Sequence, residues 1–154
     1  MKTKRLVCVL MACALTLSGI IPPARAVEVP NEPVIWLEDM EWEQIDLSTV
    51  NWQEDIVPRT VCSIDNALPG SSMHFVTSFL SLKANSVVAF NCSYSPSSAS
   101  MDFGVISSTG KFYAINVKGG SIKQSVGISQ AGSYAVAVRN NSSQTVRVVG
   151  FVNY

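Results

Sequence analysis

The chain has 154 residues, and its 11 basic and 11 acidic side chains give a formal net charge of zero at pH 7. The hydrophobic fraction of 47% excludes an extended disordered protein, and the length is typical of one domain with additional segments. Zero net charge argues at first against polyanionic partners, but the charges are unevenly distributed along the chain.

Residues 1–26 have the three parts of a secretory signal peptide. Lys2, Lys4 and Arg5 precede an apolar run over residues 6–21, and Ala24-Arg25-Ala26 supplies the small residues of a cleavage site. The apolar run is shorter than the roughly 20 residues needed to span a bilayer. We therefore expect a secreted chain without a membrane span after cleavage. An uncleaved anchor and a lipoprotein are the alternatives.

Residues 27–59 are expected to form an acidic N-terminal arm. They contain nine acidic side chains and a single base, Arg59, which together give a charge of −8. All three tryptophans, Trp36, Trp42 and Trp52, lie in this segment. Such a composition is typical of an extended arm that docks on a partner. Packing of the tryptophans on the protein's own domain is the favoured interpretation, because exposed tryptophan lowers solubility.

Residues 60–154 have the pattern of an all-β domain. Apolar and polar residues alternate in short runs, as at Tyr134, Val136 and Val138, with Arg139 on the opposite face. Clusters of Gly, Pro, Asn and Ser separate the runs. The pattern predicts an antiparallel two-sheet β-sandwich, jelly-roll or immunoglobulin-like, of about eight strands. The strands are expected near 60–65, 73–82, 86–94, 101–107, 111–117, 121–129, 133–140 and 145–153.

Cys62 and Cys92 are the two cysteines that remain once the signal peptide is removed. An even pair in an exported protein permits one disulfide, and both residues share parity with apolar neighbours in their strands. We therefore regard them as a disulfide candidate. Two separate buried thiols are the alternative, because free cysteine behaves as a small hydrophobic residue.

The predicted domain carries six bases and two acids, a charge of +4. We therefore expect electrostatic attraction between this domain and the acidic arm. Binding to an anionic cell-wall polymer, a glycan or a protein would use basic or aromatic side chains. The candidates are Lys111, Lys118, Lys123, Arg139, Arg147, Trp36, Trp42 and Trp52. Phe112, Tyr113 and Tyr134 are candidates for stacking on sugars, although core packing is favoured for them. Nucleic acid is not expected, because the bases are not clustered with aromatic residues.

Catalytic and cofactor motifs are scarce. His74 is the only histidine, and a lone histidine in a strand is more often structural than catalytic. No cofactor is expected, because neither a zinc pattern nor a phosphate-binding loop is present. Asp102 is a weak candidate for a calcium ligand, since calcium needs six to eight oxygen atoms. These observations predict a protein that is not an enzyme.

Three segments carry a resemblance to a known family. They are residues 79–88, residues 100–106 followed by Gly110-Lys111, and the G-x-Y strand over residues 132–138. Together they resemble the bacterial pre-peptidase C-terminal domain, a small β-sandwich appended to secreted proteases. The family's aspartate pair is represented by Asp102 alone. The ending over residues 146–154 is similar to that of small exported proteins of Gram-positive bacteria.

The combined expectation is a secreted, non-enzymatic β-sandwich module that binds a ligand at or near the cell surface. The alternative is a small secreted effector, inhibitor or toxin-like protein that uses the acidic arm for recognition. The sequence leaves the ligand and the oligomeric state open.

Overall fold

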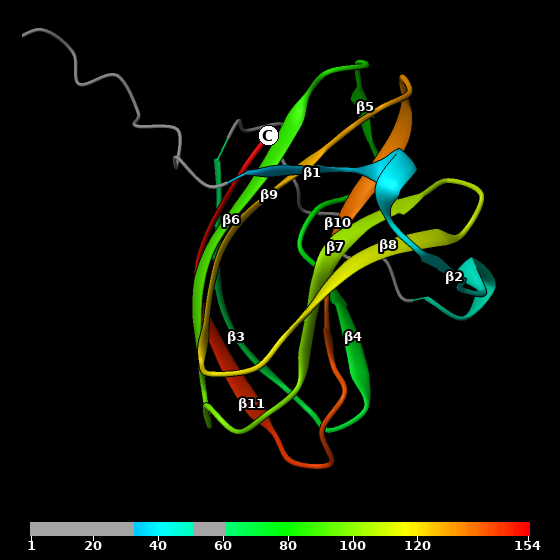
Figure 1. Ribbon diagram of the computed structural model, residues 1–154. Coiled ribbons are helices and arrows are strands. Elements are labelled where there is room, and N and C mark those ends of the chain that lie inside the picture. Colours follow the sequence, from blue (N-terminus) through cyan, green and yellow to red (C-terminus); the bar gives the residue numbers. More distant parts are fainter. Residues whose placement is uncertain (1–32, 51–60) are drawn as a thin grey trace, which may run out of the picture.

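The structure, a computed structural model, describes residues 33–50 and 61–154. The predicted signal peptide and Trp52 lie outside the described residues. The described chain is a β-sandwich with eleven strands in two sheets (Figure 1). Among the described residues, no helix is long and apolar enough to cross a membrane.

Sheet A has five strands, in the order β1 (Val34–Trp36), β9 (Ser121–Gly127), β6 (Val87–Ser95), β11 (Val146–Asn153) and β3 (Val61–Leu68). Sheet B has the order β2 (Trp42–Gln44), β8 (Lys111–Val117), β7 (Met101–Ser107), β10 (Gly132–Asn140) and β4 (Ser72–Phe75), and β5 (Leu80–Leu82) also pairs with β10. All pairs are antiparallel except β1 with β9. The predicted fold class is confirmed.

The expected strand near 73–82 is two strands, which pair with successive parts of β10. The interruption lies at Thr77, a fully buried residue whose Oγ1 accepts a hydrogen bond from the backbone N of Val136 at 2.9 Å. A buried backbone N–H needs an acceptor. In the gap between β4 and β5, the Thr77 hydroxyl is that acceptor for Val136 of β10.

The hydrophobic core lies between the sheets and is built from alternate residues of the long strands. Phe90 of β6 and Phe103 of β7 meet edge to face across it, with ring centroids 6.0 Å apart. The predicted inward face of β10 is confirmed, because Tyr134, Val136 and Val138 belong to this core whereas Arg139 does not. The strict alternation leaves the odd-numbered residues of β10 on the outer face of sheet B.

The described part of the predicted arm contributes a strand to each sheet. β1 pairs with β9 of sheet A and β2 pairs with β8 of sheet B, and the 3-10 turn η1 (Leu37–Asp39) joins them. Leu37 of this turn is 6% exposed and belongs to the core cluster. Burial of a leucine contributes about 1.5–3 kcal/mol, more than an exposed ion pair. Apolar packing and backbone pairing therefore hold the segment in place.

Trp36 packs on its own domain, as the favoured interpretation of the arm predicted. It lies opposite Gly127 in the β1–β9 pair. A side-chain carbon at Gly127 would overlap the Trp36 ring. The absence of a side chain at Gly127 therefore makes the space that the ring occupies.

The predicted disulfide between Cys62 and Cys92 is not formed, and both residues are free thiols. Cys62 of β3 lies opposite Val152 and Cys92 of β6 lies opposite Gly150, so β11 separates them. Two strand spacings amount to about 9–10 Å, more than the roughly 7 Å limit for the Cα atoms of a disulfide. Burial raises the pKa of Cys92 to about 11, which keeps this thiol protonated and unreactive at neutral pH.

Candidate functional site

The outer face of sheet B carries polar residues that the alternation of its strands places side by side. Asp102 of β7 lies between Arg139 of β10 and Asn116 of β8, each of which is its direct cross-strand partner. Phe103 points into the core, so its neighbour Asp102 points outward. Asp102 is nevertheless 95% buried, because neighbouring side chains cover it.

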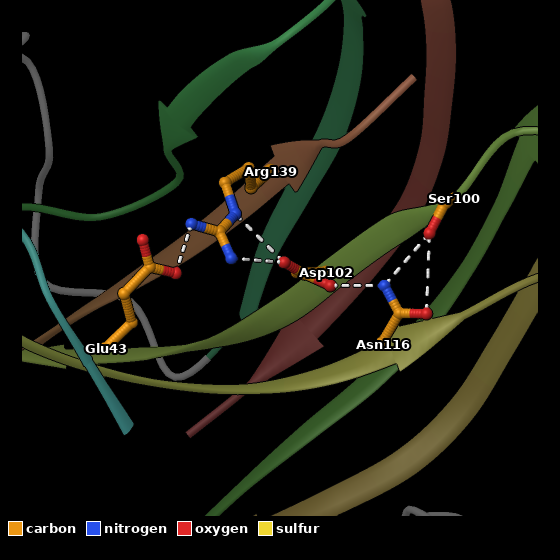
Figure 2. A network of polar contacts seen from close by, with 5 residues as sticks. All are labelled: Glu43, Ser100, Asp102, Asn116 and Arg139. Atoms are coloured by element: carbon orange, nitrogen blue, oxygen red, sulfur yellow. Dashed lines mark hydrogen bonds and ion pairs between the residues drawn. The ribbon is translucent and has the colours of Figure 1, made fainter. Parts of the chain in front are cut away.

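Asp102 is the centre of a network of polar contacts (Figure 2). Its Oδ2 accepts a hydrogen bond from Arg139 Nε at 2.9 Å and lies 2.7 Å from the second guanidinium nitrogen. Its Oδ1 accepts a hydrogen bond from Asn116 Nδ2 at 2.6 Å, and Ser100 bonds to the same amide. A buried carboxylate requires such compensation, because an unpaired buried charge is strongly destabilising.

Arg139 connects this network to the acidic segment. Its third nitrogen contacts Glu43 of β2 at 2.7 Å, and its guanidinium carbon lies 5.3 Å from the centroid of the Phe112 ring. Figure 2 shows the guanidinium between the two carboxylates. Burial alone would lower the pKa of Arg139, but the hydrogen bonds to Glu43 and Asp102 outweigh this effect and raise it. The arginine is therefore a fixed positive charge.

Two hollows meet at Arg139. The first, which we call the apolar hollow after the apolar half of its lining, has a volume of about 490 Å³ and is lined on that side by Ile45, Val50, Met73 and Phe75. Its polar lining consists of Arg139, His74, Thr49, Ser71 and Ser72. The acidic hollow has a volume of about 250 Å³ and is lined by Glu41, Trp42, Glu43, Asp102, Phe112, Ala114 and Arg139. Residues 41–50 form one wall of both hollows, so the site lies at the junction between the acidic segment and sheet B.

The turn η2 (Leu47–Thr49) shapes the wall of the apolar hollow. Asp46 caps this turn, and its Oδ1 accepts hydrogen bonds from the hydroxyl of Ser48 at 2.7 Å and from the backbone N of Ser48 at 2.9 Å. These two bonds lower the pKa of Asp46. The cap holds Thr49 and Val50 beside the hollow.

His74 contributes to the apolar hollow, and its ring also contacts β3. Its Nε2 lies 2.6 Å from Nδ2 of Asn66. Burial lowers the pKa of His74, because it disfavours the imidazolium. An amide N–H donates to Nε2 only while that nitrogen carries no proton. The hydrogen bond from Asn66 therefore requires the neutral form of the His74 ring.

His74 is expected to make stability depend on pH. Its pKa in the folded state is below its unfolded value, so the unfolded state binds more protons as the pH falls below about 6.5. The free energy of unfolding should decrease from pH 7 to pH 5.5, by at most about 1.4 kcal/mol per pH unit for one proton. Urea unfolding at several pH values measures it. His74→Gln removes the titration, and an equal slope in that variant would contradict the prediction.

The predicted basic residues are not brought together. Lys111 and Arg139 lie on sheet B, Lys123 and Arg147 are on the outer face of sheet A, and Lys118 is exposed between β8 and β9. Arg147 forms an ion pair with Asp65 of β3. The Lys111 ammonium lies 4.3 Å from the centroid of the Trp42 ring, which is half-exposed. A single basic patch is therefore not formed by these five residues.

The other predicted residues take structural positions. Phe112 and Tyr134 are buried and Tyr113 packs against the core, which agrees with the packing favoured for these rings. Asp102, the calcium candidate, has both of its oxygen atoms in contact with Arg139 and Asn116. No group of three or more His, Cys, Asp or Glu residues in the described ranges could hold a metal ion.

Sequence reasoning missed the other members of the network around Arg139 and Asp102. Glu43 lies among nine acids without a local feature that distinguishes it, and Asn116 and Ser100 belong to no motif. The one available signal is Asp102, an acid at the second position of a mostly apolar strand. Comparison with protein-family models, with curated proteins and with solved structures found no match to this chain.

Proposed function

We propose that the protein is a secreted, non-enzymatic binding module that acts at or near the cell surface and holds a protein ligand at the two hollows beside Arg139. The observation that carries this proposal is the meeting of a half-apolar hollow and an acidic hollow at Arg139. A peptide segment with an apolar side chain next to a basic one complements both hollows. Secretion is supported by the composition of residues 1–26.

The charges around the acidic hollow favour a basic ligand over an anionic polymer. Three carboxylates line it, and Arg139 is the one cation among the described residues of its lining. Asp102 is nearly buried, and both of its oxygen atoms already accept hydrogen bonds within the protein. Glu43, by contrast, is 57% exposed in its side chain, and Glu41 is exposed. A lysine or arginine of a partner would reduce the remaining negative potential. An anionic polymer would meet like charges here, which disfavours it.

A panel of short fluorescent peptides that combine lysine or arginine with leucine or phenylalanine tests the proposal by fluorescence anisotropy. Glu41→Gln should weaken binding several-fold, and binding should decrease as salt increases, because the contact is an exposed charge pair. Val50→Asp should weaken binding further, since it places a charge in the apolar hollow. Far-UV circular dichroism checks that both variants are folded.

Asp39→Asn is the matched control, since it removes one exposed charge from the same segment outside the lining of the hollows. It should change affinity far less than Glu41→Gln. Equal losses in the two variants would indicate nonspecific charge attraction and contradict the site. Absence of binding to every peptide in the panel would contradict the protein ligand.

A secreted effector that uses the acidic segment for recognition is the second candidate. It is supported by the exposure of Glu38, Asp39, Glu41 and Asp46, which form no ion pair within the described residues. Deleting residues 27–59 is not a clean test of it, because the deletion removes β1 and β2 from the sheets. Charge neutralisation of Glu38 and Asp39 together discriminates, since an effector should lose its target and the hollows, which neither residue lines, should keep their peptide.

A further inference from the structure

The outer face of sheet A, on the opposite side of the sandwich, carries exposed apolar side chains. Phe151 is 55% exposed, Val61 45% and Val149 42%. Val148 and Val152 point into the core, so Val149 and Phe151 of the same strand point outward. Val61 lies on the neighbouring strand β3, opposite Asn153. The three side chains thus share one surface, which we call the Phe151 face.

Hydroxyl and amide groups surround the aromatic ring on this face. Phe151 lies between Ser63 of β3 and Asn91 of β6, which are its cross-strand partners on the two sides. Val149 lies next to Ser93 in the same way. Ser63, Asn91 and Ser93 are all exposed. The Ser93 hydroxyl donates to the Val149 carbonyl at 3.5 Å, which leaves its oxygen to accept. The aromatic platform is therefore flanked by two groups that can both donate and accept hydrogen bonds, Ser63 and Asn91, and by one acceptor.

The charges on this face are largely compensated within the protein. Arg147 donates two hydrogen bonds to Asp65, from Nε at 3.0 Å and from its terminal nitrogen at 3.1 Å. Both side chains are more than half exposed, and their opposite charges neutralise each other at the surface. Lys123, next to Asn91 on β9, is the remaining cation near the ring among the residues that the structure describes. One lysine gives little attraction for an anionic polymer.

The composition of the face distinguishes between the remaining partners. Protein interfaces are enriched in aromatic residues, methionine and arginine, and are depleted of serine. This face has one aromatic ring among serine and asparagine side chains. A sugar ring matches it better, because its C–H face is apolar and its edge carries hydroxyl groups. Four strands also offer a width of about 14 Å without a deep pocket, which suits a chain of sugars.

We infer that the Phe151 face is a second binding surface, on which a neutral polysaccharide chain stacks one sugar ring on Phe151 and bonds through its hydroxyl groups to Ser63, Asn91 and Ser93. This surface is separate from the hollows at Arg139, and its role does not depend on the ligand held there. The module would then contact a neutral polymer with one sheet and a protein with the other.

Affinity electrophoresis of the full chain in gels that contain hydroxyethyl cellulose, laminarin or galactomannan tests this inference. At least one of these neutral polymers should retard the wild type, and Phe151→Ala should reduce the affinity at least tenfold. Phe151→Trp should retain binding, because the ring face is preserved. Thermal unfolding of both variants checks that the fold is intact, as expected for an exposed side chain.

Lys123→Ala and Glu41→Gln are the controls. Neither should change retardation in the neutral gels, and 0.5 M salt should leave it unchanged. The inference is overturned if none of the three polymers retards the wild type, if Phe151→Ala binds as the wild type does, or if retardation requires Lys123 and disappears with salt. If the two surfaces are separate, Phe151→Ala should bind the peptides with wild-type affinity. Failure of the polysaccharide inference would therefore leave the proposed function unaffected.

Discussion

Replacing Arg139 with methionine should lower the free energy of unfolding by about 2–4 kcal/mol, because it leaves the buried carboxylate of Asp102 without a cation. Asp102 is only 6% exposed in its side chain and receives both an ion pair and a hydrogen bond from this arginine. Asn116 alone cannot neutralise the charge. For a domain of this size the loss corresponds to roughly 10 °C or more in melting temperature. Differential scanning calorimetry and urea unfolding measure it.

Arg147→Met is the matched control for this prediction. Arg147 and Asp65 also form an Arg–Asp pair, on the other sheet, but their side chains are 66% and 60% exposed. Water solvates both charges there, so the loss should stay below about 1 kcal/mol. Asp102→Asn in the Arg139→Met background should recover part of the stability, because it removes the uncompensated charge. Equal losses for the two arginines would contradict the role of burial.

Replacing Gly104 with alanine should destabilise the protein by about 3 kcal/mol, the upper end of the usual cost of overpacking, since the atoms in the way belong to the backbone. A side-chain carbon at Gly104 would overlap the carbonyl oxygen of Tyr113 and lie 2.7 Å from the Cα of Ala114. Both atoms belong to the backbone of β8, which pairs with β7 at this point. The two central strands would have to separate. Urea unfolding and the yield of soluble protein measure the effect.

Gly119→Ala separates this steric effect from the loss of glycine's backbone freedom. Gly119 has a φ of +107°, and a side-chain carbon there would meet no atom within 4 Å. Only conformational strain of about 1–2 kcal/mol is expected at that position. A loss at Gly104 no larger than the loss at Gly119 would show that β7 and β8 can separate at little cost.

The strands could be predicted from the sequence because their signals are local. Alternation and turn residues placed the long strands of the sandwich within a few residues, and the inward face of β10 followed from Tyr134, Val136 and Val138. The interruption at Thr77 could not be predicted. It depends on a contact across the sheet, in which the Thr77 hydroxyl takes the place of a backbone acceptor for the N–H of Val136. The cysteines were paired wrongly because parity places a side chain on a face but does not say which strand lies between two others.

Only two residues of the candidate site, Arg139 and Asp102, could be selected from the sequence. Arg139 and Asp102 were both singled out, one as a base on an outward position and one as an isolated acid, but for roles that did not connect them. Their contact depends on β7 and β10 being neighbours in a particular register. Glu43 is 96 residues from Arg139 in the chain. No local pattern contains information on so distant a pair.

The sequence by itself determined the fold class and the unequal distribution of charge, because periodicity and composition are properties of short segments. Only the tertiary structure decided what those charges do. It placed β1 at the edge of one sheet and β2 at the edge of the other, where backbone pairing and burial of Leu37 contribute more than charge attraction. It dispersed the predicted bases over both sheets and set Arg139 between Asp102 and Glu43. Long-range strand pairing brings these groups together, and that pairing is a property of the whole chain.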